Sequence, residues 1–253
     1  MLTFSLITVT YNAEKTLPRT LDSVLNQTYG SIEHIIVDGA STDTTGTLAI
    51  DYLQKSDEQD KGHNVKFISE HDNGLYDAMN KGLRMATGDY VCFLNAGDSL
   101  PDKDTLSELA KAVGDSETLP AVVYGQTELV DSDGKVVGKR HLTAPNKLSW
   151  KSFKNGMLVC HQAFYARRDL AQECMYDLQY RFSADFDWCI RVMKKAEAKA
   201  LELKYADMTL VHYLKDGMTT ENHVASLKER YRIMQHYYGW MTTFVKHIGF
   251  LFR

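Results

Sequence analysis

The chain has 253 residues, of which 44% are hydrophobic and 25% are charged. Those fractions are ordinary for a folded domain and unlike those of a disordered or a membrane-spanning chain. Lysine and arginine number 29 against 33 aspartates and glutamates, a formal net charge of −4, which argues against a protein that binds nucleic acid over its whole surface. The length suits one α/β domain with an appendage.

The first residues, MLTFSLITVTYN, contain no basic leader, no apolar stretch of signal length and no small-residue cleavage site. We therefore expect no export signal. No apolar run in the chain is long enough to cross a bilayer. The four cysteines form no C-x-x-C pair, and we interpret them as buried side chains in a reducing compartment. Together these features predict a cytoplasmic protein.

In the first half of the chain, short β-branched and apolar runs alternate with segments whose apolar residues recur at helical spacing. The predicted strands span 4–10, 34–37, 65–69 and 90–94. The first predicted helix begins near Glu14 and Pro18 and ends at Tyr29-Gly30, and the next two span 44–53 and 76–86. The polar segment 55–64 is typical of a surface loop. This alternation predicts a mostly parallel sheet with helices on both faces.

The second half is less regular. Its predicted helices span 105–113 and 186–196, and its predicted strands span 157–166 and 206–213. Segments 121–129 and 135–140 predict a hairpin around a turn with the sequence Asp-Ser-Asp-Gly.

Polar residues follow the predicted strands of the first half. They are Thr10, Tyr11 and Asn12 after the first strand, Asp38 after the second, Asp72 and Asn73 after the third, and Asn95 to Asp98 after the fourth. In open α/β sheets, ligands bind beyond the carboxyl ends of the strands. We therefore expect these side chains to meet along one rim.

Laid in order, these motifs resemble the family 2 glycosyltransferases, most closely the branch found in bacterial capsule and exopolysaccharide synthesis. The resemblance is carried by Val9 to Asn12, Val37 to Asp43, Ala78 to Gly82 and Gly88 to Asp98. It implies the GT-A fold over 1–220, with a nucleotide-binding half at 1–101 and an acceptor-binding half at 102–220. Residues 221–253 would form a helical tail.

The resemblance implies a nucleotide-sugar donor site. Thr10, Tyr11 and Asn12 would line the nucleotide pocket, and Asp38 would accept a hydrogen bond from the imide N–H of uracil, which favours a UDP-sugar. An ordinary turn role is the alternative for Asp38. The same donor-binding set includes Asp72, Asn73, Asn80, Asn95 and Ala96.

By resemblance, Asn95-Ala96-Gly97-Asp98 occupies the place of the family's D-x-D-type motif. Asp98 would then bind a divalent cation, Mn²⁺ or Mg²⁺, that bridges the two phosphates. Asn95 and Gly97 stand where many members have aspartate, so the sequence leaves metal dependence open. His212 is a candidate second metal ligand, with a structural role as the equal alternative.

The segment Ser183 to Trp188 resembles the family's E-D-type motif at the start of a helix, with Ala184 in place of its glutamate. Asp185 then matches the general base of an inverting transfer, kept ionised by the helix N-terminus. The alternative is that Ser183 and Asp185 only cap the helix, and Asp187 is the reserve base. His161 and Gln162 would face the acceptor.

The activity implied is transfer of a sugar to a hydroxyl of a glycan or lipid-linked saccharide in surface polysaccharide synthesis. The alternative is a non-catalytic sugar-nucleotide-binding subunit of a polysaccharide assembly complex. The tail from Val224 is rich in aromatic residues and has five basic residues against Glu229, a local net charge of +4. It would lie peripherally at the inner face of the membrane, or pack on the domain or on a second copy in a homo-oligomer.

Overall fold

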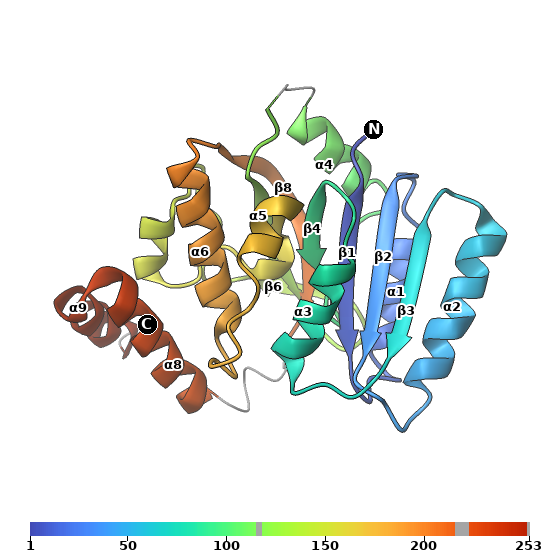
Figure 1. The fold of residues 1–253 in the computed structure, drawn as a ribbon, viewed down its shortest axis with the longest axis horizontal. Coiled ribbons are helices and arrows are strands. Elements are labelled where there is room, and N and C mark those ends of the chain that lie inside the picture. The colour runs from blue at the N-terminus through green and yellow to red at the C-terminus, as the bar shows by residue number, and fades with distance from the viewer. Residues whose placement is uncertain (115–117, 216–222, 252–253) are drawn as a thin grey trace.

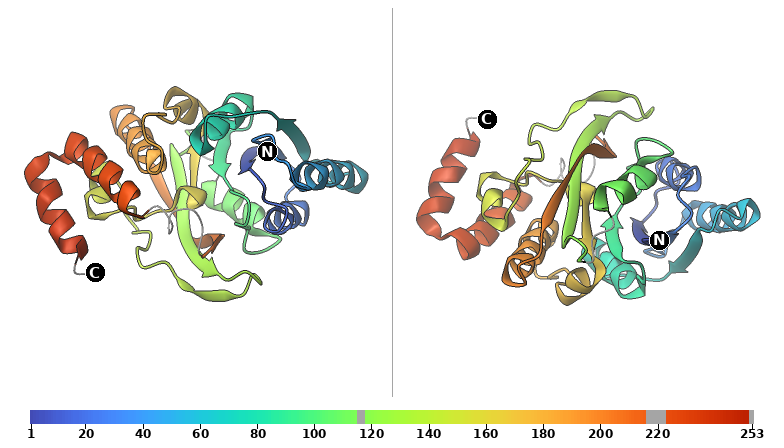
Figure 2. Two further views of the ribbon diagram at one scale, coloured as in Figure 1. Left: turned by 90° about the horizontal axis from the view of Figure 1, so that it is seen from below. Right: turned by 90° about the horizontal axis from the view of Figure 1, so that it is seen from above.

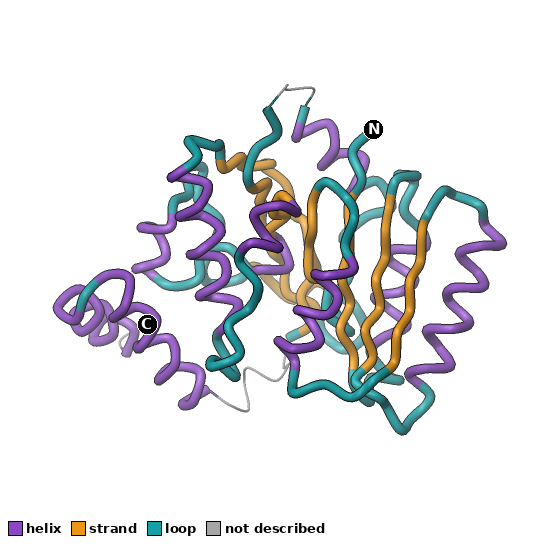
Figure 3. The backbone as a smooth tube through the Cα atoms, viewed as in Figure 1, coloured by secondary structure: helices purple, strands orange, loops and turns teal. Residues whose placement is uncertain are grey.

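The computed structural model describes residues 1–114, 118–215 and 223–251. Within them the backbone forms one sheet (Figures 1 and 3), made of β1 (Phe4–Thr10), β2 (Ile32–Asp38), β3 (Asn64–Ser69), β4 (Tyr90–Phe93), β5 (Val122–Val130), β6 (Val136–Lys139), β7 (Phe164–Arg167) and β8 (Leu203–Leu214). The strand order is β3-β2-β1-β4-β7-β5-β6, and β8 also pairs with β5. Strands β1 to β4 run parallel, β7 runs antiparallel to β4 and β5, and β8 runs parallel to β5.

Helices cover both faces of the sheet (Figures 1 and 2). One face carries α3 (Leu75–Met85), α5 (Arg168–Glu173) and α6 (Ala184–Ala198), and the other carries α1 (Leu17–Leu25) and α4 (Thr105–Val113), with α2 (Thr45–Gln59) beside α1 at the β3 edge. Beyond α6, α8 (His223–Tyr238) and α9 (Trp240–Leu251) form a hairpin at the end of the molecule opposite α2. The predicted mostly parallel sheet between helices, with a helical C-terminal extension, is confirmed.

An aromatic cluster joins α6 to the centre of the sheet. The Trp188 ring stacks on Tyr176, with ring centroids 5.2 Å apart, and meets Phe93 of β4 edge-on at 5.5 Å. All three side chains are buried, and such offset and edge-on contacts add to the gain from burying their area. The N-terminal turn of α6 is therefore held at a fixed position relative to the end of β4.

Two predicted elements differ in the structure. Segment 157–166 is a strand only from Phe164; before it lies a buried turn that ends in the 3₁₀ turn η2 (His161–Ala163). Burial of this turn explains why its sequence is as apolar as that of a strand. Helix α2 continues through 55–59, where a loop was predicted, because Tyr52 and Ser56 still face the core, and it ends at Asp60 with a left-handed φ of 46°. The hairpin of β5 and β6 is confirmed.

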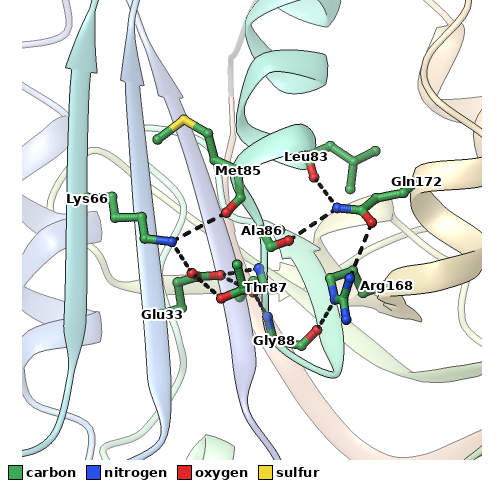
Figure 4. A network of polar contacts seen from close by, with 10 residues as sticks. Glu33, Lys66, Leu83, Met85, Ala86, Thr87, Gly88, Arg168 and Gln172 are labelled. Atoms are coloured by element: carbon green, nitrogen blue, oxygen red, sulfur yellow. Dashed lines mark hydrogen bonds and ion pairs between the residues drawn. The ribbon is translucent and has the colours of Figure 1, made fainter.

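A buried carboxylate fastens the turn that precedes β4, at the end of the sheet away from the predicted rim (Figure 4). Glu33 of β2 pairs with Lys66 of β3 at 2.5 Å and accepts hydrogen bonds from the N–H and hydroxyl of Thr87 and from the Ser5 hydroxyl. Burial alone would raise the pKa of Glu33, but these donors outweigh it and hold the pKa at about 2.

The other side of the same turn is tied to α5. The Arg168 guanidinium donates to the Gly88 carbonyl at 2.8 Å, and the Gln172 amide donates to the carbonyls of Leu83 and Ala86 (Figure 4). The connection from α3 to β4 therefore has buried or half-buried polar partners on both sides.

We expect Glu33→Gln to lower the free energy of unfolding by about 3 kcal/mol at neutral pH, the value of a pKa held about 2.5 units below its ordinary 4.5. A depressed carboxyl pKa stabilises the fold above the unfolded-state pKa. That stability is lost as the pH falls from about 4.5 towards 2. Denaturant titrations across this range would measure the effect. Glu70→Gln, at the exposed Lys81 pair, is the control; equal losses in both variants would contradict this account.

Candidate active site

The topology brings polar residues from both halves of the chain to one rim. The carboxyl ends of the parallel strands β1 to β4 lie on one edge of the sheet, and the amino-terminal end of the antiparallel β7 lies on the same edge. Strand β8 also ends there, since the Leu214 N–H donates to the Asp98 carboxylate at 3.0 Å. This is the edge at which open α/β sheets bind ligands.

Asp98 is a buried carboxylate at the turn after β4. One of its oxygens accepts the Leu214 N–H and the other accepts the Gln162 amide at 3.1 Å. Burial raises the pKa of Asp98 to about 6, although these hydrogen bonds and the electrostatic interactions with His161 and Arg19 act in the opposite direction. Asp98 is therefore ionised at neutral pH and takes up a proton in mildly acidic solution.

Asp185 is a half-buried carboxylate in the first turn of α6. Its two oxygens are held by the Tyr76 hydroxyl at 3.1 Å and by Nδ1 of His161 at 3.3 Å. Burial would raise the pKa of Asp185, but the hydrogen bond and charge of His161, the charge of Arg230 and the Phe186 N–H outweigh it and keep the pKa below its ordinary value. Asp185 is thus ionised at neutral pH.

The neighbouring residues His161 and Gln162 connect these two carboxylates. His161 contacts Asp185, and Gln162 contacts Asp98. Both residues are buried in η2, directly before β7. One dipeptide therefore sets the spacing between the acidic group at the sheet edge and the acidic group on α6.

The loop before Asp185 is held from outside by α8, a support that motif analysis did not find. The Glu229 carboxylate accepts the backbone N–H groups of Arg181, Phe182 and Ser183 at 2.8–3.0 Å. Ser183 also hydrogen-bonds Ser226. The one sequence signal was Glu229 itself, the single acid in a basic segment.

Asp187, the reserve base, has a structural role. It is buried, pairs with Arg191 at 2.6 Å and accepts the Tyr237 hydroxyl at 2.8 Å. With a cation and a phenol already bound to its carboxylate, it ties α6 to α8 and is not a free base.

In the first half of the chain, Tyr11 is 64% exposed and its ring lies beside Gly39. Asn12 accepts the Thr42 N–H through its side chain and has a left-handed φ of 46°. Asp38 lies at the same rim but is buried, and its oxygens accept Ser41 and Ser69 donors. A carboxylate has about four acceptor positions. With three donors bound, Asp38 retains about one of them for a ligand.

The remaining predicted donor residues separate into two groups. Asp72 packs against Gly39, beside Tyr11, and accepts the Gly74 N–H, while Asn73 is exposed and bonds Asp77. The side-chain amide of Asn80 is not free at the rim. The residue is buried, and its amide bonds both the N–H and the carbonyl of Tyr176. In this structure the Asn80 amide positions Tyr176, and its expected donor contact stays a prediction.

Three buried polar atoms at the rim have no hydrogen-bond partner among the described residues: Thr10 Oγ1, Asn95 Oδ1 and His161 Nε2. Buried polar groups are almost always bonded, so each such atom calls for an explanation. They come from the ends of β1, β4 and the turn before β7. A polar ligand bound across the rim would supply the missing partners.

The residues suit a divalent cation held mainly by its substrate. No cluster of three or more His, Cys, Asp or Glu side chains that could hold a metal ion occurs in the part of the chain described. Asp98 and the unpartnered Asn95 oxygen offer oxygen ligands, and Mg²⁺-type ions need only one or two carboxylates beside phosphates and water. Ala96 lies half-buried between them. Gly97 has a φ of +102°, and a side chain there would meet Leu214 at 2.8 Å.

His212 does not join this set. Its backbone bridges Ser99, but its imidazole pairs with Glu128 of β5 at 3.3 Å. The register of β8 against β5 sets these two residues opposite one another. Metal binding by His212 therefore stays a prediction, which its pairing with Glu128 does not support.

Comparison with known proteins identifies relatives over most of the chain. The model of the family described as glycosyl transferase family 2 matches residues 5–174. A PGL/p-HBAD biosynthesis glycosyltransferase of Mycobacterium bovis is 35% identical over 215 residues, which cover 85% of this chain and 77% of that protein. The amylovoran biosynthesis glycosyltransferase AmsB of Erwinia amylovora is 28% identical over 76% of this chain and 64% of its own length.

Solved structures share the fold. S. aureus TarS 1-349 in complex with UDP-GlcNAc superposes with a TM-score of 0.69 at 19% identity, over 92% of this chain and 65% of that one. The mannosyltransferase PcManGT of Pyrobaculum calidifontis, in complex with GDP-Man and Mn²⁺, superposes with a TM-score of 0.61 at 17% identity, over 91% and 63%. The chain spans less than two thirds of these structures. From the family match and the M. bovis relative, the chain belongs to the family 2 glycosyltransferases and is itself a glycosyltransferase.

Proposed function

We propose that this glycosyltransferase moves a sugar from a UDP-sugar to a hydroxyl of a glycan or lipid-linked saccharide, with inversion at the anomeric carbon, in surface polysaccharide synthesis. The observation that carries the proposal is the pair of ionisable carboxylates, Asp98 and Asp185, fixed at one rim by Gln162 and His161. The presence of both groups, together with membership of a catalytic family, favours an enzyme over a non-catalytic sugar-nucleotide-binding subunit.

The donor would lie across the ends of β1 to β4. The exposed Tyr11 ring offers a face on which a nucleobase stacks, and the remaining acceptor position of Asp38 suits the uracil imide N–H. A TarS structure holds UDP-GlcNAc and a PcManGT structure holds GDP-Man, so fold alone does not select the base. Asp38 is the residue that favours uridine.

Asp98, with the Asn95 oxygen, would hold a Mn²⁺ or Mg²⁺ ion against the diphosphate. When bound, the cation neutralises charge that develops on the departing nucleotide diphosphate. Asp98 must be ionised to take part, and its buried setting leaves it so only above a pH of about 6.

In the proposed reaction, Asp185 removes the proton of the acceptor hydroxyl while the oxygen of that hydroxyl attacks the anomeric carbon. The bond from that carbon to the diphosphate oxygen breaks on the opposite face, and the bonding electrons leave with the nucleotide diphosphate. Tyr76 and His161 orient the carboxylate. A proton transfer of this kind typically contributes about 10²–10⁴-fold in rate.

The proposed division of the chain assigns 1–101 to the nucleotide, 102–220 to the acceptor and 221–253 to a tail. The last boundary lies outside the described residues. Within the described tail, α8 supports the acceptor half directly, since Ile233 and Met234 are fully buried and Glu229 holds the loop before Asp185. The proposed acceptor half thus includes α8 as a supporting element.

For Asp185→Asn we expect kcat to fall by about 10²–10⁴-fold with unchanged UDP affinity, because the variant loses the base and keeps the donor site. Sugar transfer or donor hydrolysis, with calorimetric UDP binding alongside, would measure both. Asp60→Asn is a matched control on an exposed residue with a left-handed φ that asparagine accepts.

His161→Gln tests whether Asp185 or His161 accepts the proton of the acceptor hydroxyl. Glutamine can still donate to Asp185, so we expect it to keep most of the turnover. A loss as large as that of Asp185→Asn would instead assign the base to the unpartnered Nε2 of His161, with Asp185 as its orienting group.

Metal affinity should depend on pH through Asp98. Because a proton and the cation compete for the same carboxylate, Mn²⁺ affinity of the UDP complex should fall about tenfold per pH unit below pH 6, the pKa of Asp98. Manganese titrations followed by electron paramagnetic resonance would measure this. In Asp98→Asn both the affinity and its pH dependence should be lost; a native affinity that is flat from pH 5 to 7 would contradict the assignment.

A further inference from the structure

Helix α9 lies at the end of the molecule farthest from α2 (Figures 1 and 2), and it presents an exposed apolar stripe. Its members recur at positions i, i+1, i+4, i+5 and i+8, which share one face of a helix. They are Trp240, Met241, Phe244, Val245 and Ile248, exposed at 63%, 66%, 53%, 66% and 43%. Large apolar side chains gathered on one face, rather than scattered singly, mark an interaction surface.

The other side of α9 is anchored, so the stripe has a fixed outward direction. Thr243 is fully buried, and the Lys246 ammonium donates to Asn155 of η1 (Trp150–Asn155) at 2.7 Å. The ring of His247 meets Tyr231 of α8, with centroids 4.8 Å apart. These contacts hold α9 in one orientation, so the apolar stripe faces away from the domain and does not pack against its core.

The hairpin is positively charged while the chain as a whole has a net charge of −4. From 224 to 249 it carries four lysines and arginines against Glu229, and the Glu229 carboxylate is bound by the backbone N–H groups before Asp185. Lys228 and Arg232 are exposed on α8. A hairpin that carries both an exposed apolar stripe and exposed cations matches the chemistry of an anionic lipid surface.

The exposed cations disfavour a second copy of the chain as the occupant of the stripe. In a two-fold symmetric contact through the hairpin, Lys228 and Arg232 of one copy would face the same cations of the other. An anionic bilayer offers apolar chains and negative charge together. No helix among the described residues has the length and apolar character needed to span a bilayer.

We propose that the α8–α9 hairpin docks on the surface of an anionic bilayer, with the α9 stripe in the boundary between headgroups and acyl chains and Lys228 and Arg232 near lipid phosphates. The role of this docking rests on the proposed function, because a lipid-linked acceptor would be presented to the enzyme at that surface. Since α8 also holds the loop of Asp185 through Glu229, docking would fix the base relative to the bilayer.

Sedimentation of the full chain with vesicles tests the proposal. We expect binding to vesicles of phosphatidylglycerol and phosphatidylcholine in equal parts, and at least tenfold weaker binding to phosphatidylcholine alone. Trp240→Ser with Phe244→Ser should weaken binding to the anionic vesicles at least tenfold. Lys228→Gln with Arg232→Gln should weaken it about thirtyfold, since each of the two cations near such a surface contributes about 1 kcal/mol.

The matched control is Ile50→Ser with Val137→Ser, which removes apolar side chains 48% and 50% exposed on α2 and β6 and should leave vesicle binding unchanged. Calorimetric UDP binding by each variant separates the two proposals: a variant that binds UDP but not vesicles has lost only docking. No vesicle binding by the native chain, equal losses in the control, or a dimer abolished by the Trp240 and Phe244 changes would overturn the proposal.

Discussion

The adjacent contacts of His161 and Gln162 are the constraint on which the site depends. One residue holds Asp185 on α6 and the next holds Asp98 at the end of β4. The two carboxylates come from different parts of the fold, and the dipeptide links them by side-chain hydrogen bonds in addition to the aromatic packing that holds α6 against β4. Their environments also separate their acidities, since burial dominates at Asp98 while bonded donors dominate at Asp185. Two carboxylates in such different settings suit two different tasks.

The fold divides stability and function between the two ends of the sheet. At the amino end of β4, the carboxylate of Glu33 has a donor at each side and the turn is closed by α5 (Figure 4). At the carboxyl end, buried polar atoms lack partners, and Asn12 and Ala40 have left-handed φ values of 46° and 59°. Unsatisfied groups and unfavourable backbone geometry persist where a ligand needs them. The hydrogen-bonded amino end of the sheet stabilises the fold enough for the rim to keep these unsatisfied groups.

The position of the rim could be predicted from the sequence, because it depends only on which residues follow the parallel strands. Side-chain pairing across the fold could not be predicted in the same way. Helical spacing located Asn80 correctly but could not tell that its amide faces the backbone of Tyr176. The pairing of His212 with Glu128 follows from the register of β8 on β5, and no local pattern encodes that register. The buried turn before β7 has the composition of a strand, so periodicity mistook one for the other.

In the proposed mechanism, a single base, Asp185, drives a direct displacement at the anomeric carbon. The stereochemistry of the product tests it most directly, and a slow hydrolysis with water as acceptor is sufficient for the measurement. Proton NMR of the sugar first released from an α-linked UDP-sugar, recorded before mutarotation, should show the β anomer. Release of the α anomer would mean two successive displacements or front-side attack and would contradict the role assigned to Asp185.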